Sequence, residues 1–289
     1  MSQTAPVKAA TRDAYGKALV ELGKKYKDVV VLDADLSEST RTNWFAKEFP
    51  DRFFDCGIAE ENLITIAAGL ATCGKIPFAS TFAVFGTERA YNQIRQTVAY
   101  PKLNVRIVCT HSGITVGPDG TSHQTTFDVA IMRALPNMTV LVPADAPETT
   151  AAVNVMGEYD GPIYMRLGRT PQRVFYEADY SYKGKKQKFE IGKSVELRAG
   201  KDLTIICNGI MVAETMDAAD ALKAEGIEAQ VINMHTVKPI DRDAIIKAAQ
   251  ETKAIVTAEE HSVLGGLGGA VAEVLVRNKP VPVEMVGVN

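Results

Sequence analysis

Short runs of β-branched and other apolar residues alternate with longer amphipathic stretches along most of the chain. The first amphipathic stretch covers residues 12–26, and the apolar run VVVLDAD follows at 29–35. Short apolar runs bounded by turn residues are typical of buried strands, whereas apolar positions every three or four residues indicate helices. The alternation predicts an α/β protein with mainly parallel sheets, each covered by helices on both faces.

The same alternation predicts the remaining elements of the first half. Strands are expected in RFFDCGI, PFAST, VRIVCTHS, TVLVPAD and PIYMRLG, and helices near 59–72, 87–99, 127–134 and 147–159. These segments fit one parallel sheet whose crossover connections are helices.

The pattern lapses in FYEADYSYKGKKQKFE, which is rich in charged and tyrosine residues and is typical of an interdomain connection. We therefore predict a first domain over residues 1–175, a linker over 176–190 and a second domain over 191–289. In the second domain, strands are expected in LTIICNG, EAQVINM, AIVTAEE and VPVEMVGV, and helices near 211–224, 241–251 and 268–277.

Composition and charge exclude several classes of protein. With 289 residues, 46% hydrophobic and 23% charged, the chain is long enough for about two soluble domains. Its net charge is −3 and it has no long basic run, so a nucleic-acid partner is not expected. No apolar run reaches the ~18 residues of a membrane span, and the N-terminus lacks the apolar core of a signal peptide. We expect a cytoplasmic protein without a membrane partner.

The glycine-rich segment GGLGGA at 265–270 lies between a predicted strand and a predicted helix. A dinucleotide-binding fingerprint would have an acidic residue at the end of the next strand, whereas Glu284 lies in the middle of it. We expect these glycines instead to let the start of a helix pack closely against the sheet or another subunit.

The densest candidate chemistry lies in the segment VCTHSGITVGPDGTSHQTTFD, which carries two of the four histidines, His111 and His123. Asp119 lies between them in a polar stretch that contains three glycines. Because loops at the carboxyl ends of parallel strands line the binding crevice, this loop is the first candidate for substrate contact.

These residues carry a resemblance to a known family. The chain contains, in order and at about the family's spacings, the motifs DCGIAEEN, STFAVFGTERAYNQIR, THSGITVGPDGTSHQ, LPNMTVLVPAD and PIYMRLGR. It thereby resembles the pyrimidine-binding half of transketolases, and its tail resembles their C-terminal domain. VGPDGTSHQ is the most specific motif, since it is similar to the Gly-x-Asp-Gly-x-x-His-Gln loop of transketolase and 1-deoxyxylulose-5-phosphate synthase.

The resemblance implies a thiamine diphosphate enzyme in which Glu60 contacts N1′ of the aminopyrimidine. The alternative is that Glu60 and Glu61 only stabilise a helix N-terminus, which is our interpretation of Glu61. Phe82 and Phe85 match the aromatic residues that hold the pyrimidine ring. The family's next aromatic position is Glu88 here, and Tyr91 is the other candidate to complete the pocket. Asp35 matches an acid near the thiazolium.

The substrate residues also follow from the resemblance. Those matching sugar-phosphate contacts are Arg12, Ser39, His111 and Arg169, with Arg166 as an auxiliary. Asp119 and His123 match positions that face the donor's hydroxyl and carbonyl groups. Arginine binds phosphate bidentately, and histidine exchanges protons with hydroxyls, so the set suits a phosphorylated polyhydroxy ligand.

One family motif is missing. Transketolases hold the diphosphate through Mg²⁺ on a Gly-Asp-Gly segment followed by asparagine, and this chain has only PDG at 118–120. The resemblance therefore implies no metal ligand here and an N-terminal partner subunit that holds Mg²⁺, in an α2β2 heterotetramer. The family's C-terminal domain usually continues beyond the last strand. Asn289 is therefore a candidate truncation point of a longer chain.

The implied activity is that of a transferase, the C-terminal subunit of a split transketolase of the pentose phosphate pathway. It would move a two-carbon ketol unit from a ketose phosphate to an aldose phosphate. The alternatives are a 2-oxo acid dehydrogenase β subunit, half of a 1-deoxyxylulose-5-phosphate synthase-like enzyme, or a non-enzymatic α/β binding module. DGTSHQ with His111 argues against the dehydrogenase, and the clustered acids and histidines argue against the binding module.

Overall fold

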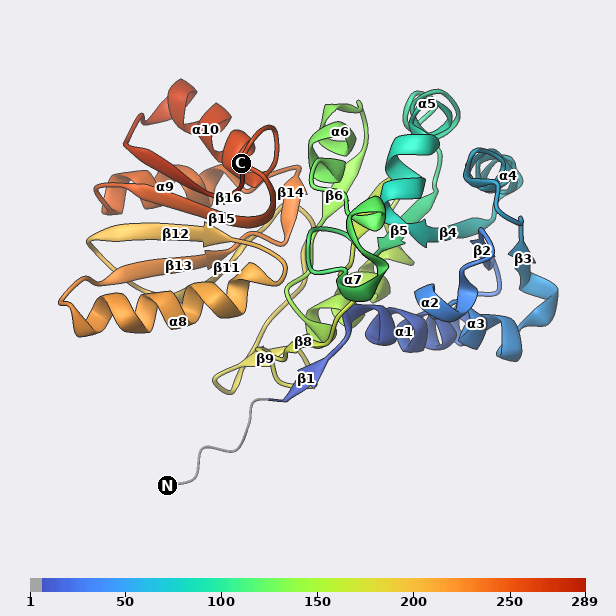
Figure 1. The fold of residues 1–289 in the computed structure, drawn as a ribbon, viewed down its shortest axis with the longest axis horizontal. Coiled ribbons are helices and arrows are strands. Elements are labelled where there is room, and N and C mark those ends of the chain that lie inside the picture. The colour runs from blue at the N-terminus through green and yellow to red at the C-terminus, as the bar shows by residue number, and fades with distance from the viewer. Residues whose placement is uncertain (1–6) are drawn as a thin grey trace.

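The computed structural model describes residues 7–289, which form two sheet domains side by side (Figure 1). The larger sheet has the strand order β14-β6-β7-β5-β4-β2-β3, and its neighbouring strands are parallel except for β14 with β6. Its strands are β2 (Val29–Asp33), β3 (Phe53–Asp55), β4 (Ile76–Phe82), β5 (Arg106–Thr110), β6 (Thr139–Leu141), β7 (Ile163–Arg166) and β14 (Thr236–Lys238). The mainly parallel α/β prediction is confirmed for this half.

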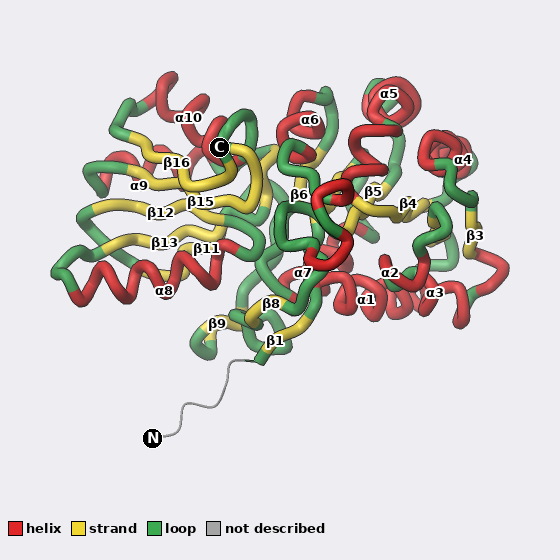
Figure 2. Tube along the Cα trace, in the orientation of Figure 1, coloured by secondary structure: helices red, strands yellow, loops and turns green. Residues whose placement is uncertain are grey.

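Helices cover both faces of the larger sheet (Figures 1 and 2). One face carries α1 (Thr11–Lys25), α2 (Ser37–Thr40), α3 (Asn43–Glu48) and α7 (Ala146–Met156), and the other carries α4 (Glu60–Thr72) and α6 (Asp128–Ala134). Because side chains alternate along a strand, Val31 of β2 joins one apolar core and Leu32 joins the other. Both faces of β2 are buried, which explains its unbroken apolar run.

The helix expected near 87–99 is longer and less regular than predicted. Two π-helical segments, Val84–Arg89 and Ile94–Ala99, flank the short helix α5 (Tyr91–Gln93). Wide turns of this kind are frequent at functional sites, and this one follows directly after β4.

The smaller sheet has the strand order β11-β13-β12-β15-β16, and only β11 is antiparallel to its neighbour. Its strands are β11 (Val195–Arg198), β12 (Leu203–Cys207), β13 (Ala229–Asn233), β15 (Ile255–Ser262) and β16 (Val283–Val288). Its helices, α8 (Met211–Ala224) on one face and α9 (Arg242–Glu251) and α10 (Leu267–Asn278) on the other, confirm the second set of predicted helices (Figure 1).

The domains are joined more closely than the sequence suggested. Strand β14 follows β13 in the chain, yet it pairs with β6 and forms the edge of the larger sheet. The expected polar linker is a packed segment with the short hairpin β9 (Ser181–Tyr182) and β10 (Lys185–Lys186). Its Tyr180 is buried and donates to Glu148 of α7. Residues 8–9 (β1) also pair with 172–173 (β8).

Gly268, at the start of α10, packs closely against the sheet, as expected for this glycine-rich segment. A Cβ on Gly268 would lie 2.8 Å from the Met285 sulfur of β16 and 2.9 Å from the Thr257 hydroxyl of β15. Such distances are shorter than carbon contacts allow, so the helix can approach the sheet this closely only with glycine there.

Candidate active site

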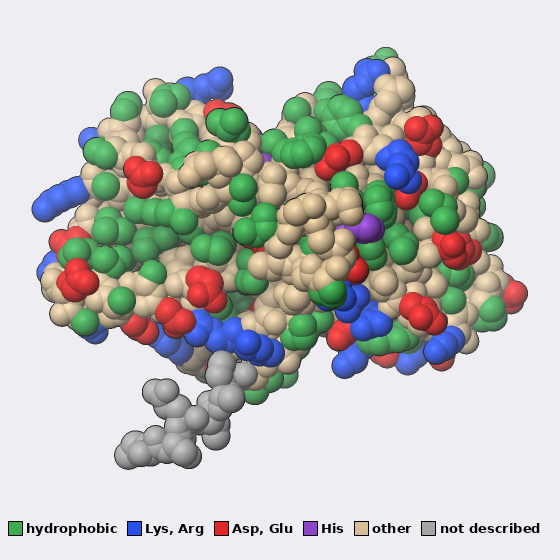
Figure 3. Space-filling model, in the orientation of Figure 1, with side chains coloured by type: hydrophobic (Ala, Val, Ile, Leu, Met, Phe, Trp, Pro, Cys, Tyr) green, Lys and Arg blue, Asp and Glu red, His purple; other side chains and the backbone are tan. Residues whose placement is uncertain are grey.

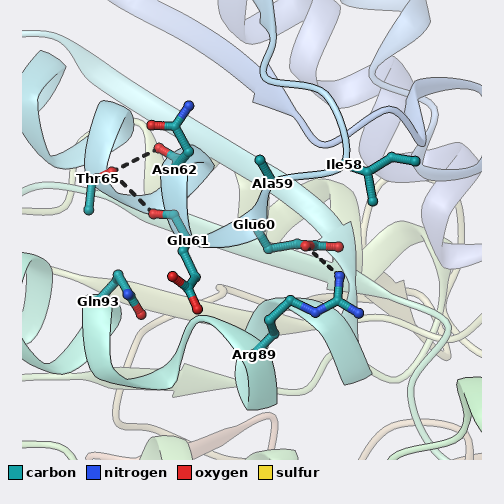
Figure 4. A pocket seen from close by; sticks show the side chains of 8 residues that line it. All are labelled: Ile58, Ala59, Glu60, Glu61, Asn62, Thr65, Arg89 and Gln93. Carbon is teal, nitrogen blue, oxygen red and sulfur yellow. Dashed lines mark hydrogen bonds and ion pairs between the residues drawn. The ribbon is translucent and has the colours of Figure 1, made fainter.

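The adjacent acids Glu60 and Glu61 open α4 and face different surroundings. Only 1% of Glu60 is exposed, whereas Glu61 is exposed to solvent. The Glu60 carboxylate accepts a hydrogen bond from Arg89 at 2.7 Å (Figure 4). Both acids line a pocket of about 520 Å³ between α4 and the helical segment that carries Arg89 and Gln93. A carboxylate that only stabilises a helix N-terminus can do so from the solvent-exposed surface. The burial of Glu60 at the wall of a pocket therefore indicates a further role.

Two aromatic rings at the end of β4 and just after it lie nearly parallel. The rings of Phe82 and Phe85 are 5.9 Å apart with an interplanar angle of 13°. Arg89 lies over the Phe85 ring at 4.9 Å and thereby links the aromatic pair to Glu60. Parallel rings of this kind can form a wall against which a flat heterocycle packs.

Both predicted loop histidines contact the same aromatic pair. His111 stacks on Phe82 with ring centroids 3.7 Å apart, and His123 meets the edge of Phe85 at 5.5 Å. His111 follows the end of β5 and has a φ of 59°, in the left-handed region that most side chains avoid. An unfavourable backbone angle at a candidate site residue is typical of functional positions.

The charge state of His111 follows from its surroundings. Burial, followed by the nearby guanidinium groups of Arg12 and Arg169, lowers its pKa to about 3. The imidazole is therefore neutral near pH 7, and its Nδ1 is 2.8 Å from the Thr110 hydroxyl. With Nδ1 engaged by Thr110, Nε2 is the nitrogen left to hydrogen-bond a ligand, as donor or acceptor according to the tautomer.

Asp119 connects His111 to a group of arginines. Its carboxylate lies 2.9 Å from Arg169 and 3.7 Å from Nε2 of His111. Arg12 donates to the backbone oxygen of Ser39 at 2.8 Å. The pKa of Arg12 is lowered by burial and by the neighbouring positive charge of Arg41. Arg41 and Arg169 thus lie close enough to Arg12 to lower its pKa, and guanidinium groups gathered in this way are suited to bind an anion.

Clustered acidic and basic side chains lie next to a histidine on the surface of the larger domain (Figure 3). Side-chain contacts join six of the predicted residues, together with Arg89, in one series, Glu60–Arg89–Phe85–Phe82–His111–Asp119–Arg169. Segments far apart in sequence thus form one continuous site.

Asp35 and its neighbour Asp33 have different roles. Asp35 is exposed in the loop after β2, with a φ of 62°. Asp33 is fully buried and accepts hydrogen bonds from the hydroxyls of Thr40 and Thr42, so it fixes the turn that carries Ser39. Burial raises the pKa of Asp33 to about 6 despite these donors.

Tyr91 and Glu88, the two candidates to complete the aromatic pocket, both have partners elsewhere in this structure. The hydroxyl of Tyr91 donates to the backbone oxygen of Ile131 and the side chain packs against the core. Burial raises the pKa of Glu88, which lies near Thr125 and Asp128. Arg89 packs on Phe85 instead.

Three residues of the site region were missed by the sequence analysis. Arg89 could have been found from its spacing of four residues from Phe85 within a helical segment. No motif or spacing in the sequence marks Arg41 or Asp33 as a residue of the site. Arg166, expected as an auxiliary phosphate contact, is buried and bound to Asp128 at 2.8 Å.

Within residues 7–289, no cluster of three or more His, Cys, Asp or Glu side chains is arranged to hold a metal ion. No helix in that range is long and apolar enough to cross a membrane.

Comparison with known proteins identifies the class to which this fold and site belong. Residues 7–173 match the family model "Transketolase, pyrimidine binding domain", and residues 192–289 match "Transketolase, C-terminal domain". The chain belongs to the transketolase family of transferases and carries these two of its domains.

Individual relatives are divided in the same way. The chain is 54% identical over 267 residues to a putative transketolase C-terminal section from Methanocaldococcus jannaschii, covering 92% of this chain and 82% of that protein. It is 45% identical to a 6-deoxy-6-sulfo-D-fructose transketolase subunit from Clostridium sp., covering 96% of this chain and 84% of that one. A solved split-gene transketolase, described as an inactive β4 tetramer, has 55% identity and a TM-score of 0.90 over 98% of this chain and 90% of its own.

Proposed function

We propose that this chain is the C-terminal subunit of a thiamine diphosphate-dependent split transketolase. It transfers a two-carbon ketol unit from a ketose phosphate to an aldose phosphate, and it is active only with a partner subunit. The observation that carries this proposal is the continuous series from the buried carboxylate of Glu60 to the ion pair of Asp119 with Arg169.

The residues present fit the pyrimidine half of the cofactor. The buried Glu60 carboxylate would hold N1′, and the parallel rings of Phe82 and Phe85 would pack against the heterocycle. Asp35 would face the thiazolium side. When bound, thiamine diphosphate would supply a thiazolium carbon that, once deprotonated, is a nucleophile toward the carbonyl of the donor sugar. Glu60 would exchange a proton with the ring nitrogen, so its present hydrogen bond from Arg89 would have to adjust.

The arginines and the loop residues would bind the substrate. Arg12 and Arg169 would hold its terminal anionic group next to Ser39, and the neutral His111 would hydrogen-bond a hydroxyl. Asp119 and His123 would orient the donor's hydroxyl and carbonyl groups. A phosphate is our first choice for the anion. The Clostridium relative is named for a sulfo-sugar, so a sulfonate is the second choice.

The diphosphate and Mg²⁺ would be held by the partner subunit, because this sequence has no Gly-Asp-Gly segment. An α2β2 assembly is proposed. The inactive β4 tetramer of the similar split-gene protein supports the expectation that this chain is inactive by itself.

Steady-state assays test the proposal. The purified chain, given thiamine diphosphate, Mg²⁺, a ketose phosphate donor and an aldose phosphate acceptor, should show no turnover. Adding the chain that carries the missing diphosphate motif, sought first in the adjacent upstream gene, should produce ketol transfer. Robust turnover without a partner would contradict the split assignment, and failure of every candidate partner to confer turnover would contradict the transketolase assignment.

A further inference from the structure

The loop that carries the candidate site residues is held by a side chain from the other domain. This loop, residues 111–123, is called the histidine loop below. Glu260 lies on β15 of the smaller sheet, and its Oε1 accepts hydrogen bonds from the backbone N–H groups of Ile114 at 2.8 Å and Thr115 at 2.7 Å. These two donors follow His111 by three and four residues.

The loop is shaped to receive this carboxylate. A Cβ on Gly113 would lie 2.3 Å from the carboxyl carbon of Glu260, and Gly113 has a φ of 78°. Both the close approach and the backbone angle therefore require glycine at this position. The amide of Gly113 also donates to the oxygen of Thr125, which closes the base of the loop.

The position of Glu260 is itself fixed by the larger domain. Its backbone oxygen accepts from buried Arg166 at 2.8 Å, and Arg166 is paired with Asp128. The next residues along the strand also cross the junction, because the amide of Ser262 donates to Thr126. Glu260 is only 8% exposed, so solvent does not readily replace the loop amides as its partners.

We propose that Glu260 is a positioning residue for the reaction. From the smaller domain, it holds the histidine loop so that His111, Asp119 and His123 face the donor sugar. Its catalytic importance rests on the proposed function, whereas its effect on the loop does not. Since a displacement of about 1 Å in site residues can cost ~100-fold in rate, a loop with so little regular structure of its own needs such a restraint.

The adjacent Glu259 provides a matched control. It is also a buried carboxylate that accepts two backbone N–H groups, from Leu267 at 2.7 Å and Gly268 at 2.8 Å. Those donors belong to the N-terminus of α10 in its own domain. Glu259→Leu and Glu260→Leu therefore remove the same type of interaction, and only the second frees the histidine loop. Glu260→Gln keeps one oxygen as an acceptor and tests for rescue.

Amide hydrogen–deuterium exchange of the purified chain tests the effect on the loop. In Glu260→Leu, peptides spanning residues 112–124 should exchange at least tenfold faster, whereas Glu259→Leu should accelerate only peptides at the start of α10. Glu260→Gln should lie close to wild type. Unchanged exchange of the loop in Glu260→Leu would overturn the proposal, even if no partner subunit ever confers activity. Should Glu260→Leu fail to fold, the same comparison is made with Glu260→Ala, which also removes the acceptor for the Ile114 and Thr115 amides and should accelerate exchange of the loop. Wild-type exchange of the loop in Glu260→Ala would then overturn the proposal.

Kinetics with the partner subunit test the effect on the reaction. Glu260→Leu should raise KM for the donor about tenfold at matched concentrations of active sites. Glu259→Leu should leave KM within twofold of wild type, since a lower folded fraction reduces the apparent kcat and not KM. Equal KM changes in the two variants would show a merely structural role. Absence of turnover in the wild-type complex would instead contradict the proposed function and leave the exchange result to decide the role of Glu260.

Discussion

Adjacent residues of the same type have different surroundings in this protein, so single substitutions can separate their roles. Glu60→Gln in the assembled enzyme should still fold and bind cofactor, because glutamine keeps the volume and some hydrogen bonding. Exchange of the thiazolium C–H with deuterium should slow by about 10²- to 10⁴-fold, since the amide cannot exchange the proton. Exchange measured at equal cofactor occupancy checks this.

The control is Glu61→Gln, which changes the exposed neighbour in the same helical turn. It should keep wild-type exchange and lose at most about 1 kcal/mol of stability. If Glu60→Gln also kept wild-type exchange and lost only stability, this acid would be a helix cap.

The arginines of the site allow a second separation at the residue scale. Arg12→Ala should raise KM for phosphorylated donors about 10- to 100-fold, because charged hydrogen bonds contribute about 1.5–3 kcal/mol. It should have little effect on hydroxypyruvate, which has no phosphate. Arg169→Ala should impair both donors, since Arg169 also holds Asp119 at 2.9 Å. Equal losses on both donors in Arg12→Ala would remove the phosphate assignment for this residue.

Among the elements, α10 lies close to its sheet at Gly268. Gly268→Ala would place a methyl group 2.8 Å from the Met285 sulfur and should lower the free energy of unfolding by about 1–3 kcal/mol. Gly269→Ala is the control, because the nearest atom to its new Cβ is an Arg133 nitrogen at 3.7 Å. This second change should be neutral or should stabilise the helix by up to about 1 kcal/mol. Urea denaturation of both variants measures these changes in the free energy of unfolding. Similar losses of stability in the two variants would contradict the packing argument.

The turn between β13 and β14 should make stability depend on pH. His235 is buried there, stacks on Phe189 at 4.1 Å, and has its pKa lowered by burial to about 3. Below pH 6.5 the unfolded chain takes up a proton at this imidazole, while the folded chain does not until about pH 3. The free energy of unfolding therefore decreases as the pH is lowered through this window, by at most about 1.4 kcal/mol per pH unit.

His235→Phe should remove this contribution. Between pH 6.5 and 4.5, the variant should lose less stability than wild type, as measured by urea denaturation at several pH values. Phe189→Leu perturbs the same packing without removing a titrating group and should keep the wild-type slope. A wild-type slope in His235→Phe would show that this imidazole does not cause the pH dependence.

At the scale of the whole molecule, regular local patterns made the fold predictable. Buried parallel strands such as β2 are apolar on both faces, and the helices between them keep their apolar spacing, so both sheets could be anticipated. Most of the candidate site depended on the family resemblance, because a lone histidine or arginine has no local pattern that reveals its role. The extent of the linker and the two domains remains a prediction.

The contacts that could not be predicted join residues distant in sequence. Glu260 reaches amides 145 and 146 residues away, and no periodicity encodes such a pairing. Arg41 directly follows the short helix α2, with a φ of 72°, and its side chain pairs with Asp13 of α1. Strand β14 was missed because it has three residues and pairs outside its own domain.

Strand β14 limits which parts of this chain can be exchanged for the corresponding parts of a relative. A gene fusion that exchanges everything after residue 190 for the corresponding part of a relative would also exchange an edge strand of the sheet that carries the site. The foreign strand would have to match β6 in register, since pairing errors expose apolar side chains and open backbone edges to other chains. Chimeras that keep residues 233–240 from the parent should therefore be recovered as soluble protein more often than those that do not. Size-exclusion chromatography of the two sets would measure the difference, and equal recovery would show that the two halves are interchangeable modules.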